Sequence, residues 1–167
     1  EGKAVVGGTP YTDRLEDDRD FGQQEMKAAG MTILPHWTFS SFEEAIAFVK
    51  SHPDRYVVKP SGSAQNDKVL SYVGQEEDGH DVVAMLERYK KSWAQQIKSF
   101  QIQKHATGVE VAIGGYFNGK EFILPVCINF EHKKMFNGDI GPSTGEMGTA
   151  MFWNGDNILY RDTIAKM

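Results

Sequence analysis

Residues 129–149 read NFEHKKMFNGDIGPSTGEMGT, a charged cluster that runs into closely spaced glycines. The twelve residues 137–148 hold four glycines, a proline, a threonine and two acids. Glycine and proline at this density exclude a helix and make a poor strand, so we expect a loop. Such a permissive backbone suits a loop that approaches a ligand. A long surface turn that needs glycine at positive φ explains the same composition equally well.

The overall composition is that of an ordinary globular chain. Its 167 residues, 40% of them hydrophobic, are enough to bury one or two cores. The net charge of −5, with 18 basic residues scattered along the chain, gives no electrostatic footprint for nucleic acid or an anionic lipid surface. No apolar stretch is long enough to span a membrane. We therefore expect neither nucleic acid nor a membrane as a partner.

The single cysteine and the first residue bear on location and completeness. Cys127 lies in an apolar run and has no second cysteine with which to form an internal disulfide, which fits a reducing, cytoplasmic compartment. No cysteine and histidine spacing suggests structural zinc. The sequence starts at Glu1, with neither an initiator methionine nor a signal-like segment. We expect a piece of a longer protein.

Periodicity and turn signals predict a mixture of strands and helices. The predicted strands are residues 4–6, 33–34, 56–60, 69–73, 100–104, 109–117 and 121–129, and the predicted helices are 15–29, 42–52 and 81–93, with Asp81 as the cap of the last. Ser41 and Glu44 form a capping box, residues 61–68 read as a polar loop, and Asn118-Gly119 is a hairpin signal. Capped helices beside an antiparallel hairpin indicate an α+β fold rather than a βαβ array.

Lys59 lies inside the apolar strand 56–60 and must reach either the surface or an anion. Lysines on strands contact phosphates in several nucleotide folds. A position on the solvent face of an edge strand is the simpler alternative. The chain has neither GxxxxGK[ST] nor GxGxxG, so the P-loop and dinucleotide-binding folds lack their fingerprints.

Four segments, taken in order, resemble the ATP-grasp portion of the phosphoribosylamine-glycine ligases. They are LEDDRDF at 15–21, VVKPSG at 57–62, GVE at 108–110 and HKKMFNGDIGPSTGEMGT at 132–149, the last being close to the family pattern DHKR..DGD.GP.TGGMG. The resemblance implies an ATP-grasp-like fold in which the nucleotide lies between two small α+β lobes. We assign residues 1–14 to the end of a preceding domain or a linker, 15–105 to the first lobe, and 106–167 to the truncated start of the second.

The resemblance also implies an activity. Enzymes of this family use ATP to join an amine to a carboxylate through an acyl phosphate, and they act in purine biosynthesis. The expected partners of this portion are therefore the small-molecule amine and carboxylate substrates and the remaining domains of the parent protein. Their magnesium is held by a Glu and a Glu-x-Asn arrangement downstream of the TGGMG tract, beyond the last residue of this chain. We therefore expect ATP and Mg²⁺ as cofactors, assign no catalytic residue or metal ligand here, and expect the isolated chain to be inactive as a ligase.

Site residues follow from the resemblance position by position. The nucleotide-binding residues are Arg19, Lys59, Lys68, Gln103, Lys104, Ala106, Glu110 and Lys133, and the substrate-facing residues are Asp139, Thr144 and Glu146. Arg19, Lys59 and Lys133 correspond to phosphate contacts. Residues 103–106 correspond to the segment that recognises adenine, and Glu110 to the acid that accepts hydrogen bonds from ribose hydroxyls.

Several positions depart from the family pattern. Arg19 replaces a lysine and keeps the charge but not the point contact, and Gln103 replaces a glutamate, although its amide can still meet the adenine amino edge. The lid that normally reads GLAxGKGV is GSAQNDKV at 62–69, in which Lys68 stays close to the family lysine. Glu146 stands where the family has the second glycine of TGGMG, so the substrate can differ from glycine.

Three hypotheses remain open. We favour the ATP-binding part of an ATP-dependent carboxylate-amine ligase. The alternative is a nucleotide-binding module of the same fold that is catalytically incomplete or acts on a different amine or carboxylate. A downstream Glu-x-Asn in the parent protein would separate these two. The third is an interaction domain that binds no nucleotide, in which case replacing Lys59 with Ala would change no ligand interaction.

Overall fold

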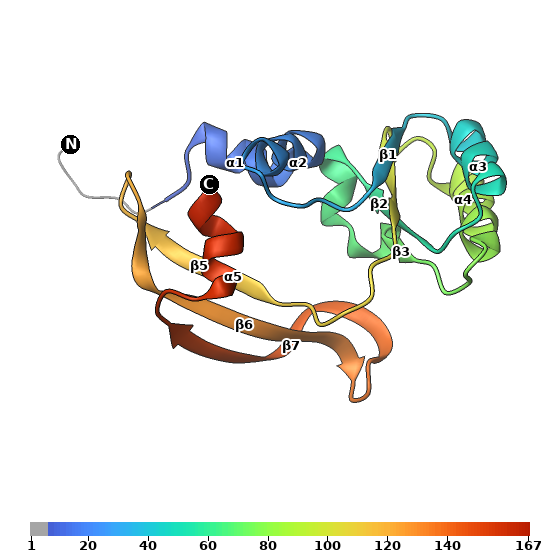
Figure 1. Cartoon of the computed structure of the whole chain (residues 1–167). Helices are drawn as coiled ribbons and strands as arrows, with labels where there is room; N and C mark the ends of the chain where they lie inside the picture. Colours follow the sequence, from blue (N-terminus) through green and yellow to red (C-terminus); the bar gives the residue numbers. More distant parts are fainter. Residues whose placement is uncertain (1–6) are drawn as a thin grey trace. The chain divides into compact units, whose positions relative to one another are not determined.

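The computed structural model describes residues 7–167, so the strand predicted at 4–6 lies outside the described residues. The chain forms two compact units, one containing the residues up to Glu25 together with Ile33–Ala106, the other Met26–Thr32 together with Thr107–Met167. Both mix helices with antiparallel strands, which confirms the α+β prediction (Figure 1). Within the described part of the chain, no helix is both long and apolar enough to cross a membrane.

The first unit is built on a four-stranded sheet in the order β1-β4-β2-β3. Its elements are α1 (Pro10–Asp17), α2 (Arg19–Ala28, which runs into the second unit), β1 (His36–Phe39), α3 (Phe42–Ser51), β2 (Tyr56–Pro60), the 3-10 turns η1 (Gly62–Asn66) and η2 (Lys68–Leu70), β3 (Tyr72–Val73), α4 (His80–Ser92) and β4 (Phe100–Lys104). All neighbouring strands are antiparallel. The structure confirms the predicted strands at 56–60 and 100–104, whereas β1 begins at His36 rather than at residue 33.

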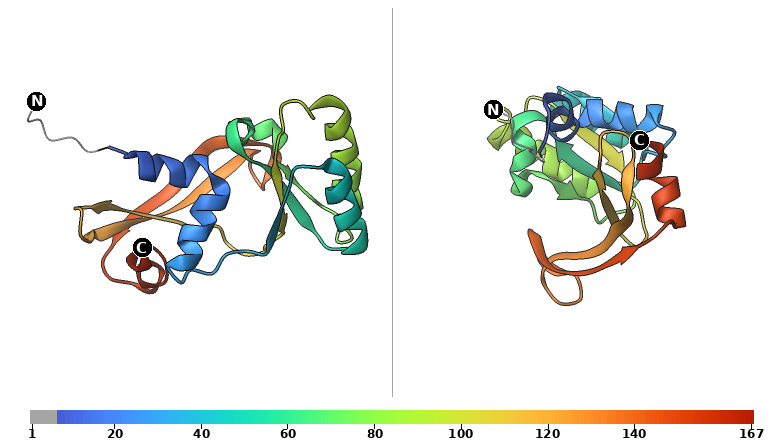
Figure 2. Two further views of the ribbon diagram at one scale, coloured as in Figure 1. Left: turned by 90° about the horizontal axis from the view of Figure 1, so that it is seen from above. Right: turned by 90° about the vertical axis from the view of Figure 1, so that its left-hand side faces the viewer.

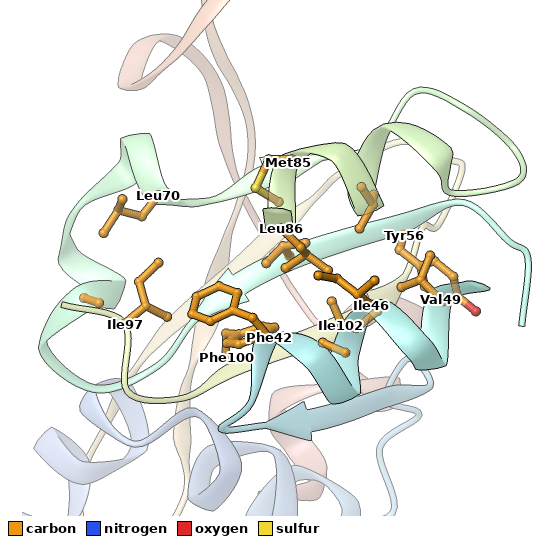
Figure 3. Packing of buried hydrophobic residues seen from close by; sticks show 14 residues of the cluster. Phe42, Ile46, Val49, Tyr56, Leu70, Met85, Leu86, Ile97, Phe100 and Ile102 are labelled. Atoms are coloured by element: carbon orange, nitrogen blue, oxygen red, sulfur yellow. The ribbon is translucent and has the colours of Figure 1, made fainter. Parts of the chain in front are cut away.

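One face of this sheet carries the core. Helices α3 and α4 lie side by side against it, and their apolar stripes meet Tyr56, Val58, Phe100 and Ile102 from β2 and β4 (Figure 3). Ser41 caps α3 by accepting a hydrogen bond from the backbone amide of Glu44 at 3.3 Å, which is one half of the predicted capping box. The alternating exposure along β2 leaves its other residues, including Lys59, on the opposite face.

The predicted helix at 15–29 is wrong in its start and in its continuity. Helix α1 begins earlier, at Pro10 behind a Thr9 capping box, and the chain leaves helical geometry at Asp18. The carboxylate of Asp18 then accepts a hydrogen bond from the backbone amide of Phe21 at 3.1 Å and so caps α2. A single residue, Asp18, therefore separates the two helices, and Gly30 at φ +77° follows the last turn of the second.

The segment between β2 and α4 also differs from prediction. The polar loop predicted at 61–68 contains η1, and Val69 and Leu70 belong to η2, which leaves only Tyr72–Val73 as strand. Helix α4 is capped by Gly79 at φ +73°, not by Asp81. The carboxylate of Asp81 instead accepts hydrogen bonds from the backbone amide of Gln75 and the hydroxyl of Tyr72, at 2.6 and 3.1 Å, and ties the preceding loop to the helix.

The second unit is a three-stranded antiparallel sheet in the order β5-β6-β7. Its elements are β5 (Ala112–Phe117), β6 (Phe122–Phe136), β7 (Ile140–Asn154), α5 (Ile158–Asp162) and η3 (Ile164–Lys166). The side chain of Asn118 accepts hydrogen bonds from the backbone amides of Lys120 and Glu121, which confirms the predicted hairpin between β5 and β6. Among the described residues of this unit, only Val126 and Ile128 are buried hydrophobics.

The loop predicted over 129–149 is wrong. This tract forms most of the long, curved β6–β7 hairpin, and only residues 137–139 turn between the strands (Figure 2). Gly138 and Asp139 take positive φ values of 72° and 57° in that turn. The pairing register shifts between His132 and Lys134 and again before Phe136, so the hairpin accommodates its glycine-rich segment through irregular strand pairing. Hydrogen bonds along the strand pair outweigh the weak strand preference of the glycines.

Candidate functional site

The sheet face opposite the core is polar. Gln101 and Gln103, two residues apart on β4, are 0% and 6% exposed and share this face because side chains alternate along a strand. Lys59 of β2 and Thr38 of β1 are both paired with Gln101 in the register of the sheet, so they flank it on the same face. Two buried carboxamides in an apolar sheet need hydrogen-bond partners.

Helix α2 supplies partners for Gln101. The Nε2 of Gln101 donates hydrogen bonds to Oδ1 of Asp20 at 2.6 Å and to Oε1 of Gln23 at 2.8 Å. The hydroxyl of Thr38 donates to the same Asp20 oxygen at 3.0 Å. The start of α2 is thereby fastened to β4 and β1 on the polar face, while α3 and α4 cover the other face (Figure 1).

Arg19 begins α2 beside this network. Burial lowers the pKa of its guanidinium, and the nearby carboxylate of Asp20 acts in the opposite direction. Its Nε is buried and has no hydrogen-bond partner among the described residues. A half-buried cation with an unused donor fits an anionic ligand. Because Asp20 is bound by Gln101, and Gln101 is paired with Lys59, the fold brings the predicted residues Arg19 and Lys59 to one region of the first unit.

Gln103 lies two residues further along β4, opposite Val57 and His36. Its Oε1 is buried and has no partner within the described part of the chain, so the side chain offers an acceptor. An adenine amino group is a suitable donor to this oxygen. Next to it, the ammonium of Lys104 forms an ion pair with Asp54 at 2.5 Å, which raises the pKa of the lysine. Ala106 follows in an exposed segment with no secondary structure.

The lid position is only partly described. The backbone of Lys68 belongs to η2, and its side chain lies outside the described residues. Gln65, within η1, donates from its Nε2 to the backbone oxygens of Glu16 and Asp17 at 3.1 and 3.0 Å. The segment that replaces the glycine-rich lid is thus attached to the last turn of α1.

In the second unit, Lys133 on β6 is the centre of an acidic cluster. Its Nζ lies 2.5 Å from Oε1 of Glu110 and 3.3 Å from Oε2 of Glu131. The hydrogen bond with Glu110 raises the pKa of Lys133, burial lowers it, and Glu131 raises it further. Asn129 donates to the other oxygen of Glu131 at 3.0 Å. The predicted residues Glu110 and Lys133 are therefore in direct contact.

The predicted substrate residues Asp139 and Thr144 make separate contacts within the β6–β7 hairpin. Asp139 is in the β6–β7 turn, where its carboxylate lies 3.7 Å from Nδ1 of His132. The hydroxyl of Thr144 donates to the backbone oxygen of Lys133 at 2.8 Å, so it is engaged in holding the hairpin. Glu146 is exposed on β7. Among residues 7–167, no three histidine, cysteine or acidic side chains are grouped so that they could hold a metal ion.

Four further residues, which form the hydrogen-bond network between α2 and the polar sheet face, were not predicted as site residues, namely Asp20, Gln23, Thr38 and Gln101. A signal for Gln101 exists, because glutamines at positions 101 and 103 of FQIQK must share one face of a strand. Nothing in the local sequence connects Asp20 to Gln101, since 81 residues separate them.

Comparison with known proteins gives consistent matches. The family model of the phosphoribosylglycinamide synthetase ATP-grasp (A) domain matches residues 17–157. Phosphoribosylamine-glycine ligase of Streptococcus pneumoniae is 31% identical over 150 residues, which cover 88% of this chain and 34% of the relative. The chain thus spans about a third of the length of the curated relatives it matches.

Two solved structures share the fold. The phosphoribosylamine-glycine ligase of Thermotoga maritima matches with a TM-score of 0.63 and 21% identity, over 87% of this chain and 36% of that one. The D-alanine-D-alanine ligase of Bacillus anthracis, solved with ATP, matches with a TM-score of 0.51 and 14% identity, over 93% of this chain and 46% of that one. These matches confirm the ATP-grasp-like fold. The chain belongs to the family of phosphoribosylglycinamide synthetase ATP-grasp (A) domains.

Proposed function

We propose that this chain is the ATP-binding part of an ATP-dependent carboxylate-amine ligase of the phosphoribosylamine-glycine type, acting in purine biosynthesis in the cytoplasm. The observation that carries the proposal is the polar sheet face of the first unit. Beside this face, helix α2 carries the half-buried guanidinium of Arg19 with an unused Nε, and on the face Gln103 offers a buried acceptor. A molecule with phosphates at one end and a purine amino group at the other satisfies both.

The phosphate end of the nucleotide is assigned to Arg19 and Lys59. A guanidinium and an ammonium can together bind several phosphate oxygens, and partial burial strengthens each charge-assisted hydrogen bond. We assign the base end to Gln103 and to the backbone of Lys104 and Ala106. The Lys104 ammonium forms an ion pair with Asp54, so only the backbone groups of Lys104 are assigned to base recognition.

By the same resemblance, we assign Glu110 and Lys133 of the second unit to nucleotide binding. The ion pair with Lys133 uses Oε1 of Glu110, and the carboxylate has a second oxygen that can accept hydrogen bonds from ribose hydroxyls. Lys133 can exchange its partner Glu110 for a phosphate, because both are anions and Glu110 is exposed. Nucleotide binding would thus redistribute this ion pair.

The proposed reaction of the whole protein has two steps. A carboxylate oxygen attacks the γ-phosphorus, the bond to ADP breaks, and an acyl phosphate forms. The amine then attacks the acyl carbon, loses a proton, and displaces phosphate. Magnesium, when bound, neutralises phosphate charge. The described residues offer no cluster that fits the ion, so no step here is assigned to it.

The substrate side supports a variation of this proposal. Glu146 places an exposed carboxylate in the tract that resembles the family's substrate-facing segment. A carboxylate there would attract an amine and repel a second acid, so the amine or carboxylate can differ from that of the relatives. We assign Asp139 and Thr144 to the same side. A catalytically incomplete nucleotide-binding module is favoured by the changed lid, in which Gln65 ties η1 to α1, and by Gln103 in place of the family's glutamate.

Calorimetric titration with a non-hydrolysable ATP analogue and Mg²⁺ tests the proposal. We expect saturable binding that weakens about tenfold or more in Lys59→Ala and Glu110→Ala, since each removes a charged partner. Lys50→Ala and Glu121→Ala remove the same charges at exposed positions and should bind like the native chain. No binding by the folded native chain, or equal effects in site and control variants, would contradict it.

A further inference from the structure

Gln101 is a neutral, fully buried side chain that is paired with Lys59 on one side and with Thr38 on the other. Both hydrogens of its Nε2 are used, one on Asp20 and one on Gln23. These two acceptors are three residues apart on α2 and so lie on one face of the helix. A double attachment of this kind fixes both the position of the first turn of α2 and the rotation of the helix about its axis.

The attachment determines where Arg19 lies. Asp20, its immediate neighbour, is held by Gln101 of β4 and also by Thr38 of β1, so two strands anchor the first turn of the helix. On the other side of β4, Lys59 of β2 is paired directly with Gln101. Gln101 is therefore the residue that connects the element carrying Arg19 with the strand carrying Lys59.

The chemistry of a carboxamide suits this place. Gln101 binds the Asp20 carboxylate without adding a charge beside the two cations, whereas a lysine or arginine would neutralise Asp20 and a glutamate would repel it. Its Oε1 is buried with no partner among the described residues, so the side chain is held by its two donated hydrogen bonds to α2.

We propose that Gln101 is a positioning residue that holds Arg19 of α2 beside the strand carrying Lys59, so that the two cations act as one binding site for the phosphates of the nucleotide. The proposal rests on the proposed nucleotide-binding function. It adds that Gln101 affects binding of the phosphates, whereas binding of the base does not depend on Gln101.

The test separates these two ends of the ligand. Inorganic tripolyphosphate probes the phosphate end and adenosine probes the base end, each titrated calorimetrically into the full chain. Gln101→Leu should weaken tripolyphosphate binding about tenfold, as expected for a displaced charged hydrogen bond, and leave adenosine binding unchanged. Gln24→Leu makes the same chemical change at an exposed position of α2 and should change neither.

A reciprocal exchange tests the contact itself. Gln101→Glu sets two carboxylates against each other and should abolish tripolyphosphate binding. Adding Asp20→Asn to that variant restores a donor and an acceptor with their roles exchanged. The double variant should recover binding to within about threefold of the native chain. This comparison also decides the question if Gln101→Leu fails to fold, which circular dichroism would reveal.

The outcomes distinguish the two levels of the proposal. If the folded native chain binds neither probe, the proposed nucleotide function fails and the inference falls with it. If the native chain binds both, equal weakening for adenosine and tripolyphosphate in Gln101→Leu would show a merely structural residue and overturn the inference alone. Absence of recovery in Gln101→Glu with Asp20→Asn would do the same.

Discussion

Gln103 is the residue at which a difference of one atom would alter the base selectivity of the proposed site. The chain has a carboxamide where the resembled family usually has a glutamate, and the buried Oε1 has no partner among the described residues. A carboxylate only accepts hydrogen bonds, but a carboxamide can rotate to present either its oxygen or its NH₂ group. The same side chain can therefore meet the 6-amino group of adenine or the 6-oxo group of hypoxanthine.

Replacing Gln103 with Glu should sharpen base selectivity. We expect the native chain to bind ATP and inosine triphosphate with affinities within about tenfold of each other, and Gln103→Glu to lower the affinity for inosine triphosphate about tenfold relative to ATP. Competition titrations with the two nucleotides measure the ratio. Gln24→Glu, at an exposed position, is the control. An unchanged ratio in Gln103→Glu would show that this side chain does not read the base.

Asp54 provides a prediction about pH. The hydrogen bond from Lys104, followed by that from the backbone amide of Arg55, lowers the pKa of Asp54 below its usual value of about 3.9. The folded state therefore gains stability from the ionised carboxylate above that value and loses it as the pH falls through the lowered pKa. Asp54→Asn should reduce stability near neutral pH and lose less than the native chain on acidification.

Urea unfolding at about pH 7 and about pH 2 measures this difference. The gap between the native chain and Asp54→Asn should narrow at the lower pH. Glu121→Gln, which changes an exposed acid, should run parallel to the native chain at both. A gap that stays constant or widens would mean that the ion pair with Lys104 does not contribute in this way.

At the scale of elements, the sequence predicted elements that depend on neighbouring residues more accurately than elements that depend on long-range pairing. Helix α3 lies where Ser41 and the apolar stripe predict it, because a cap and a helical face act over a few residues. The tract 129–149 looked like a loop and forms a hairpin, because pairing between β6 and β7 is a long-range interaction that local composition does not report. Glycine matters there only where the backbone requires it.

Gly141 and Gly145 of β7 separate these two situations. Gly141 has φ +89°, and an added Cβ would lie 2.8 Å from Cδ2 of Phe136. Gly145 has nothing within 4 Å of an added Cβ and no left-handed backbone. Gly141→Ala should destabilise the end of the hairpin by about 1–2 kcal/mol. Gly145→Ala should not.

Amide hydrogen exchange along β6 and β7 checks this prediction. Faster exchange near the 137–139 turn in Gly141→Ala, with native rates in Gly145→Ala, is the expected pattern. Equal rates in both variants would show that the hairpin end relaxes without cost.

At the scale of the whole molecule, the two units differ in how much they bury. The first has an apolar cluster that includes Val82, Leu86 and Phe100, all at most 1% exposed, whereas β7 is exposed along almost its whole length. Amides of β4, the strand flanked by β1 and β2, should therefore exchange more slowly than those of β7. Leu86→Ala should cost about 2–5 kcal/mol in the first unit.

Exchange measured by mass spectrometry on peptides from both strands tests this contrast. For Leu86→Ala, the control is Ala84→Gly, which changes helix propensity at an exposed position of the same helix, α4. Slower exchange in β7 than in β4 would contradict the difference in burial.

The expected lack of ligase turnover by the isolated chain also stays a prediction, which an assay of ADP release would decide.

The sequence by itself determined the α+β class, the strands that carry Lys59 and Gln103, helix α3, the β5–β6 hairpin and, through four ordered motifs, the family. These depend on short-range patterns that long-range packing did not override in this chain. Only the tertiary structure decided that the helix predicted over 15–29 breaks at Asp18, that the glycine tract pairs as β7, and that Lys104 is bound by Asp54. It alone joined Asp20 to Gln101, because a hydrogen bond across 81 residues arises from packing and leaves no local trace.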